Sequence, residues 1–78
     1  MKSKRQIEIQ QRDELARLML WVGSKKRLAA QLGVSRQAVY YWVKRGRISA
    51  THAREVEILT GGLFKKENLR PDVMEWTV

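Results

Sequence analysis

Apolar side chains recur at helical spacing along most of the chain, and short polar segments separate the recurrences. Within residues 12–22 they stand at i, i+3, i+4 and i+7, which predicts an amphipathic helix with Leu15, Leu18, Met19 and Val22 on its inner face. A later helix is predicted from the Ser49 cap to about Leu59, where two glycines stop it. A short last helix is predicted over residues 65–69, closed by Pro71.

Between these elements lies the segment 25–44, KKRLAAQLGVSRQAVYYWVK, which predicts two short helices joined by a tight turn. Apolar residues of 28–32 form one face of the first helix. Gly33 permits the turn, because a left-handed backbone costs glycine little. Ser24 and Ser35 are good N-caps for the two helices. This is the pattern of a helix-turn-helix, whose second helix lies in the major groove of DNA.

One local pattern supports a competing interpretation of the second helix. Residues 38–43, AVYYWV, form an apolar run rich in strand-favouring side chains and would fit a buried strand. However, an N-cap serine precedes the run, and Lys44, Arg45 and Gly46 follow it as a helix C-terminus would require. A helix with Val39 and Trp42 facing inward is therefore the preferred prediction.

The net charge of +8 is concentrated on this predicted motif. Residues 23–48 hold seven basic side chains and no acidic one, whereas residues 49–78 hold four basic and five acidic ones. A charge that served solubility alone would be spread along the chain. The pattern instead indicates an electrostatic footprint for a polyanion.

Side chains on the outer face of the second helix are candidates for contact with bases. Arg36 can bridge two acceptors of guanine, and Gln37 can pair with adenine through a donor and an acceptor. Tyr40 and Tyr41 lie one turn further on and can reach a thymine methyl or a phosphate, or one of them can line the core edge.

Other polar side chains around the motif are candidates for phosphate contact. Lys25 and Lys26 stand in the first turn of a helix, where a bound phosphate would reverse their unfavourable dipole interaction, although they can also be solvated surface charges. Cations at the end of the second helix can contact the DNA backbone or simply complement the helix dipole. The predicted DNA-binding residues are Lys25, Lys26, Ser35, Arg36, Gln37, Tyr40, Tyr41, Lys44, Arg45 and Arg47.

The segment 23–46 resembles the helix-turn-helix of phage Cro and repressor-type regulators and of their YdaS-type antitoxin relatives. The resemblance continues through RISA (47–50), TGG (60–62) and LRPD (69–72), and it covers about residues 13–73. It implies an all-α, lambda-repressor-like bundle of four to five helices with a central helix-turn-helix. The N-terminus is longer and more charged than that family usually needs, and the late segment 74–76 has no counterpart.

The length of 78 residues predicts a single domain with flanking segments. Residues 1–11 show no convincing cap and are interpreted as a basic arm, a frayed terminus or a helix extension; residues 12–70 form the DNA-binding domain. Residues 71–78 form an apolar tail that makes a dimer contact, with Leu63, Phe64 or Trp21 contributing, or packs on the first helix. Leu20 and Trp21 are expected to pack under the last helix.

Several classes of function are disfavoured by composition. The chain has no cysteine for a disulfide or thiolate metal site, no apolar run long enough to span a membrane, and no signal peptide, which fits a cytoplasmic, nucleoid-associated protein. His52 and Glu55 are expected to form an exposed ion pair rather than to hold a metal. Neither an enzyme nor a cofactor is expected.

The leading hypothesis is therefore a sequence-specific regulator that occupies a double-stranded DNA operator as a homodimer. Two alternatives remain open. The family resemblance suggests an antitoxin that neutralises a protein toxin and autoregulates its operon, although the chain has no long disordered tail to wrap a toxin. The basic charge alone would also fit an RNA-binding or nucleoid protein.

Overall fold

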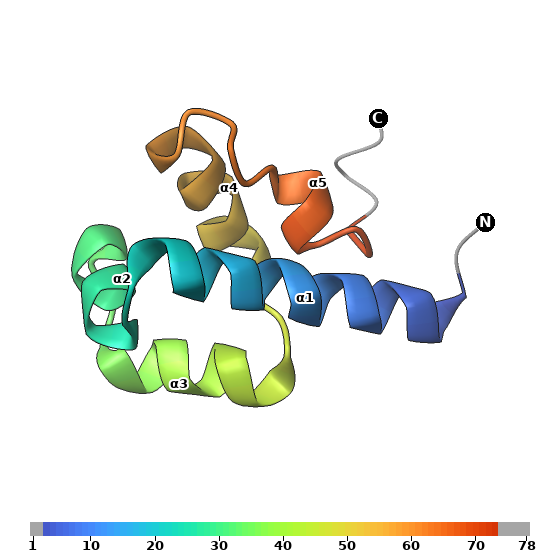
Figure 1. The fold of residues 1–78 in the computed structure, drawn as a ribbon, viewed down its shortest axis with the longest axis horizontal. Helices are drawn as coiled ribbons and strands as arrows, with labels where there is room; N and C mark the ends of the chain where they lie inside the picture. Colours follow the sequence, from blue (N-terminus) through green and yellow to red (C-terminus); the bar gives the residue numbers. More distant parts are fainter. Residues whose placement is uncertain (1–2, 74–78) are drawn as a thin grey trace.

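A computed structural model describes residues 3–73 of the chain, and in that range the protein is built from helices alone. The helices are α1 (Lys4–Val22), α2 (Lys25–Leu32), α3 (Arg36–Arg45), α4 (Ala50–Leu59) and α5 (Lys66–Leu69) (Figure 1). The all-α prediction is confirmed. The strand interpretation of residues 38–43 is wrong, because these residues lie within α3.

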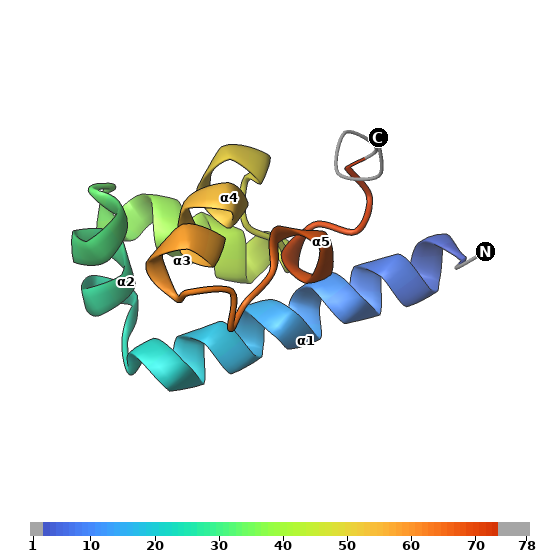
Figure 2. The same ribbon diagram turned by 90° about the horizontal axis from the view of Figure 1, so that it is seen from above.

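The long helix α1 runs through the molecule, with α3 on one side of it and α4 and α5 on the other (Figure 1). α2 closes one end and packs on α1, α3 and α4 (Figure 2). α5 packs between α1 and α4. This arrangement leaves the outer side of α3 uncovered by any other described helix.

The turn between α2 and α3 forms as its residues predict. Gly33 has a φ of 67°, in the left-handed region, and the Val34 N–H donates to the carbonyl of Ala29 at 3.0 Å. The hydroxyls of Ser24 and Ser35 accept the N–H groups of Arg27 and Ala38, both at 3.1 Å. Local hydrogen bonding therefore sets the angle between the two helices of the motif.

The N-terminal half of α1 is helical from Lys4, so the judgement that this region lacks a cap is wrong. Ser3 accepts the N–H of Gln6 at 3.2 Å, and the Gln6 side chain accepts the N–H of Ser3 at 2.9 Å. This reciprocal pair is a capping box. Residues 4–11 therefore continue the helix rather than form a separate arm.

The core is formed by the inner faces of the helices and by the loops that follow α3 and α4. Its members are all less than a tenth exposed: Leu15, Leu18, Leu28, Ala29, Val39, Trp42, Ile48, Ala53, Val56, Phe64 and Leu69. Leu18, Leu28 and Val39 are fully enclosed. The predicted inner faces of residues 12–22 and of α3 are thus confirmed.

Two apolar side chains at the end of α1 do not behave alike. Leu20 is 84% exposed, so the prediction that it packs under the last helix is wrong: the Leu15–Leu18 stripe already fills the core, and Leu20 lies off that stripe. Trp21 is 55% exposed and meets Phe64 edge to face, with ring centroids 5.8 Å apart. Phe64 itself is buried and is not available to a second subunit.

Asp72 joins three segments that are distant in sequence. Its carboxylate accepts hydrogen bonds from Arg70 at 2.8 Å and from the side-chain amide of Gln11, which is buried, at 2.6 Å. Arg70 also donates to the carbonyl of Ile48 at 3.0 Å. This network fixes α1, the α3–α4 loop and the segment after α5 to one another. The tail prediction for residues 74–78 lies outside the described residues.

The Asp72→Ala variant should be less stable than the wild type by about 1–2 kcal/mol, because the side-chain amide of Gln11 loses its acceptor and Arg70 keeps only the carbonyl of Ile48. The hydrogen bond from Arg70 lowers the pKa of Asp72 below its ordinary value. A lowered pKa stabilises the fold above the unfolded-state value of about 3.9, and this contribution is lost as pH falls through the folded-state pKa. The stability difference between variant and wild type should therefore shrink below about pH 4.

Thermal unfolding followed by circular dichroism between pH 2 and 7 measures this effect. Asp13→Ala removes an exposed acid from α1 and is the matched control, expected to stay within about 0.5 kcal/mol of the wild type. A difference for Asp72→Ala that stays constant down to pH 2 would contradict the assigned role of the carboxylate.

Candidate nucleic-acid interface

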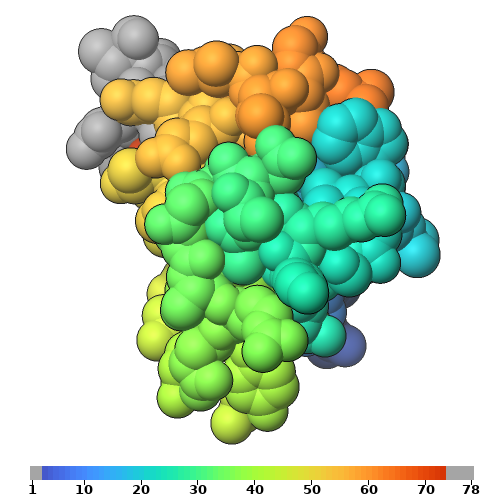
Figure 3. All heavy atoms as spheres, turned by 90° about the vertical axis from the view of Figure 1, so that its left-hand side faces the viewer, coloured from blue at the N-terminus to red at the C-terminus, as the bar shows by residue number. Residues whose placement is uncertain are grey.

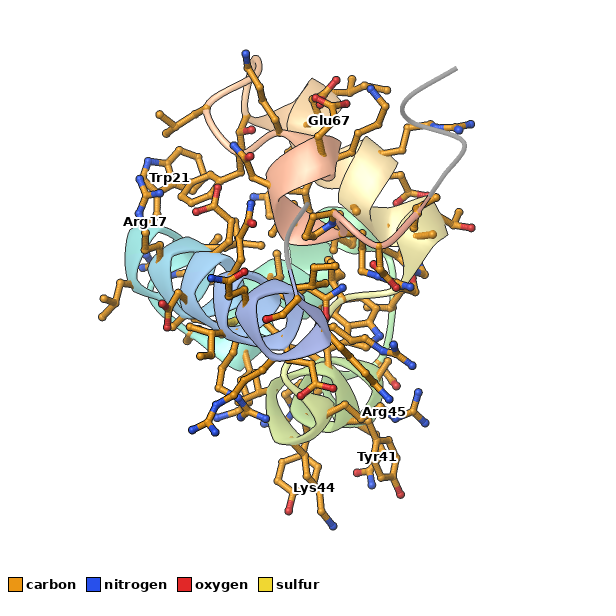
Figure 4. The ribbon with its side chains drawn as sticks, turned by 90° about the vertical axis from the view of Figure 1, so that its right-hand side faces the viewer. Arg17, Trp21, Tyr41, Lys44, Arg45 and Glu67 are labelled. Atoms are coloured by element: carbon orange, nitrogen blue, oxygen red, sulfur yellow. The ribbon has the colours of Figure 1, made fainter. Side chains whose placement is uncertain are left out.

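The outer face of α3 carries polar and aromatic side chains that make no part of the core. Val39 is fully enclosed and Trp42 is 7% exposed, whereas Arg36, Gln37, Tyr40, Tyr41, Lys44 and Arg45 are all exposed. Figure 4 shows Tyr41, Lys44 and Arg45 projecting from α3 away from the body of the molecule. The helix is anchored on one side and open to a ligand on the other.

Tyr40 and Tyr41 form an exposed aromatic pair. They are 48% and 44% exposed, and their rings meet edge to face with centroids 5.9 Å apart. Neither ring is buried as a core residue would be. Each phenol thus presents an apolar surface and a hydroxyl to the same side as Arg36 and Gln37.

A shallow hollow of about 530 Å³, open to solvent, lies between the start of α2 and the start of α3. It is lined by Ser24, Lys25, Lys26, Arg36, Gln37 and Tyr40. Figure 3 faces the end of the molecule where α2 lies above the start of α3. Five of these six residues were predicted from the sequence to contact DNA, and the structure brings them together. Ser24 is the addition, and its hydroxyl is already engaged as the α2 cap.

Electrostatics make this hollow suited to an anion. The first N–H groups of a helix have no intrahelical acceptor, and the helix dipole is positive at that end. Lys25 and Lys26 add two exposed cations there, and the segment 23–48 contains no carboxylate. An oxyanion such as a phosphate would therefore meet backbone donors and cations together.

Two of the sequence-predicted residues have intramolecular partners as well. The Ser35 hydroxyl accepts the Ala38 N–H, which leaves its own hydrogen as a donor for a ligand. Arg47 lies 3.9 Å from the Asp72 carboxylate through its Nη1 atom, so its charge is partly neutralised within the protein. Lys44 and Arg45 stand in the last turn of α3, where they also complement the helix dipole.

The structure reveals one cation that the sequence pattern did not single out. Arg12 of α1 reaches the C-terminus of α3 and lies beside Gly46. It lines a second open hollow of about 440 Å³ with Lys4, Glu8, Gln11, Arg45, Gly46 and Arg47. No signal in the sequence could have identified it, because the contact joins residues that are 34 positions apart.

His52 does not form the expected ion pair with Glu55. Its ring hydrogen-bonds the Ser49 hydroxyl through Nδ1 and packs against Trp42, with ring centroids 5.0 Å apart. Within residues 3–73, no group of three or more histidine, cysteine, aspartate or glutamate side chains is placed to hold a metal ion. His52 thus supports the buried side of α3.

The short helix α2, the turn at Gly33 and the exposed helix α3 together define the class of the protein, which is a helix-turn-helix domain. The family model described as bacterial toxin YdaS matches residues 15–78. The regulatory protein cro of Pseudomonas phage D3 is 40% identical over 63 residues, which cover 78% of this chain and 84% of that protein. The chain therefore belongs to the Cro/YdaS-type family.

This membership confirms the resemblance found in the sequence. No solved structure matches the chain significantly. Among the described residues, none of the helices combines the length and the apolar character that crossing a membrane requires.

Proposed function

We propose that this protein is a sequence-specific regulator that binds an operator in double-stranded DNA and acts by occupying it. The observation that carries the proposal is the outer face of α3, which presents Arg36, Gln37 and two tyrosines beside an anion-suited hollow. The similarity of the chain to a phage regulatory protein cro also supports DNA binding by a regulator. No chemical step is involved, because occupancy alone excludes a polymerase.

In this mechanism α3 lies in the major groove and the N-terminus of α2 rests on a backbone phosphate. Arg36 and Gln37, in the first turn of α3, contact base edges and supply specificity. Lys25 and Lys26, with the free N–H groups of α2, hold the phosphate and fix the register of the helix. Lys44 and Arg45 add affinity that does not depend on sequence.

We further propose that the protein binds as a homodimer. Regulators of this class contact two half-sites about 34 Å apart, one helical turn of DNA, and a two-fold dimer matches that spacing. Trp21 and Leu63 remain exposed, at 55% and 54%, which supports the predicted contribution of these residues to a dimer. Phe64 no longer belongs to this proposal, because it is buried.

Fluorescence anisotropy tests the proposal. Duplexes enriched from a random pool should bind with an affinity well above that for scrambled duplexes, and both affinities should fall as salt rises. Single-stranded RNA of equal length should bind more weakly than either duplex. Equal affinity for enriched and scrambled duplexes at every salt concentration would reduce the protein to a non-specific binder, and preference for RNA would favour that alternative class.

An antitoxin role is the second candidate, and it rests on the resemblance found in the sequence; the matching family model is itself described as a bacterial toxin, which associates the family with toxin systems without assigning the antitoxin part to this chain. In that role the protein would bind a toxin and also repress its own operon. Purification of the tagged chain from its native host should then recover a stoichiometric protein partner. Recovery of the chain alone, still able to bind its operator, would leave the regulator proposal standing and remove this one.

A further inference from the structure

The guanidinium of Arg12 in α1 lies beside Gly46 at the C-terminal end of α3, in the space that a side chain at position 46 would fill. A methyl group built onto Gly46 would lie 2.6 Å from Nη2 and 2.7 Å from Cζ of Arg12. A side chain at position 46 would therefore have to displace the guanidinium, whereas glycine leaves this place to it. Gly46 has a φ of 83°, which a glycine also adopts without strain.

Arg12 is one of four cations that converge here from three segments of the chain. Lys4 and Arg12 come from α1, Arg45 from the end of α3, and Arg47 from the loop that follows. One carboxylate, that of Glu8, lines the same hollow, and Asp72 lies 3.9 Å from Arg47. The hollow is therefore strongly positive even after both acids are counted.

The position of this hollow relative to α3 decides what it can bind. The hollow at the α2 N-terminus lies at the start of α3, and the Arg12 hollow lies at its end; α3 runs between them beneath α1 (Figure 1). Ten helical residues span about 15 Å. The major groove is about 12 Å wide, so a helix of this length set across the groove carries the anion sites at its two ends to the two different strands.

We propose that Arg12, with Lys4 and Arg45, binds a backbone phosphate on the DNA strand opposite to the one held at the α2 N-terminus. This inference rests on the proposed function and extends it from α2 and α3 to α1. The planar guanidinium of Arg12 can donate two parallel hydrogen bonds to phosphate oxygens. Gly46 leaves the approach open, and the helical N-terminal half of α1 brings Lys4 to the same hollow.

The first test measures the salt dependence of binding to a random-sequence 24-base-pair duplex, roughly two turns of DNA. Each lost phosphate contact should lower the slope of log affinity against log salt by about 0.9, so the loss of one contact in each subunit of the proposed dimer should lower it by about 1.8 and weaken binding roughly 60-fold at 0.1 M salt. Arg12→Gln should show this change. Arg12→Lys, which keeps the charge, should recover most of the slope.

Lys65→Gln is the matched control, because it removes the same charge from the exposed loop between α4 and α5, on the far side of α1 from α3. Its slope should equal that of the wild type. If the wild type binds duplex DNA and Arg12→Gln behaves like Lys65→Gln, this inference is overturned while the proposed function stands. Failure of the wild type to bind duplex DNA overturns both.

The second test does not depend on whether the Arg12 variant folds. Methylphosphonate groups, which carry no charge, are introduced singly along each strand of an enriched duplex, and wild-type affinity is measured at every position. Sensitive positions are expected on both strands flanking each half-site. Sensitivity confined to one strand within each half-site would overturn the inference. Where Arg12→Gln is folded, by its circular dichroism spectrum, it should lose sensitivity on one strand of each half-site, and the two-fold symmetry places these losses on opposite strands in the two half-sites.

Discussion

Replacement of Trp42 by alanine is expected to lower the free energy of unfolding by about 3–5 kcal/mol. The indole is 7% exposed, belongs to the core and packs against the His52 ring. Small domains are stable by only about 5–15 kcal/mol, so this loss removes a large share of the total. The variant should melt more than 10 °C below the wild type, since about 1 kcal/mol shifts the midpoint of a domain of this size by roughly 4–8 °C.

Tyr41→Ala is the matched control, because it removes the neighbouring aromatic ring from the opposite face of the same helix. Tyr41 is 44% exposed and its ring contacts only the edge-to-face partner Tyr40 among the described aromatic rings. Its loss should change stability by about 1 kcal/mol or less. Chemical denaturation of both variants measures the contrast. Equal midpoints for the two variants would mean that α3 is not anchored through Trp42.

This contrast between adjacent residues could be predicted from the sequence because it depends on helical periodicity alone. Val39 and Trp42 stand three residues apart and share a face, while Tyr40 and Tyr41 cannot share it. The caps were predictable for a similar reason. Each serine cap satisfies an N–H only three positions away, so Ser24, Ser35 and Ser49 carry their structural role in the local sequence.

The start of α1 shows where local patterns lead to a wrong prediction. Ser3 and Gln6 form a capping box, yet the apolar stripe that normally confirms a helix begins only at Leu15. The intervening inner position is Gln11, a buried polar residue. Its burial is possible because Asp72, 61 positions away, accepts its amide hydrogen. Pairing over such a separation leaves no trace in a single sequence.

The residues of the candidate interface also fall into two groups: those that the local sequence predicts and those that only tertiary packing brings there. Arg36, Gln37 and the lysines of α2 could be predicted as candidates from the sequence because they lie within one recognisable motif, in a segment without acidic residues. Arg12 was not found, because its place beside Gly46 arises from the packing of α1 on α3. The partial neutralisation of the Arg47 charge by the Asp72 carboxylate could not be predicted either, because it also depends on a tertiary contact. The main residues of the candidate interface thus come from one continuous segment of the chain, and tertiary contacts add to or reduce the positive charge around them.

The largest expected effect on recognition comes from Arg36→Ala and Gln37→Ala, which should each relax base preference at one or two positions of the operator. Each lost bidentate pair is worth about 1–3 kcal/mol of discrimination, roughly 5- to 150-fold between the preferred and the wrong base. Both side chains are exposed in the first turn of α3 and lie away from the core, so the fold should persist. Selection of bound duplexes from a random pool, repeated for each variant, reveals which positions lose preference.

Lys44→Ala supplies the comparison that separates specificity from affinity, because Lys44 lies on the same helix but in its last turn. A phosphate contact contributes equally to every duplex, so this variant should weaken all sequences alike and leave the selected consensus unchanged. If Arg36→Ala and Gln37→Ala weaken all duplexes alike as well, the first turn of α3 contacts only the backbone. Base recognition would then have to come from another face of the domain, and the proposed orientation of α3 in the groove would be wrong.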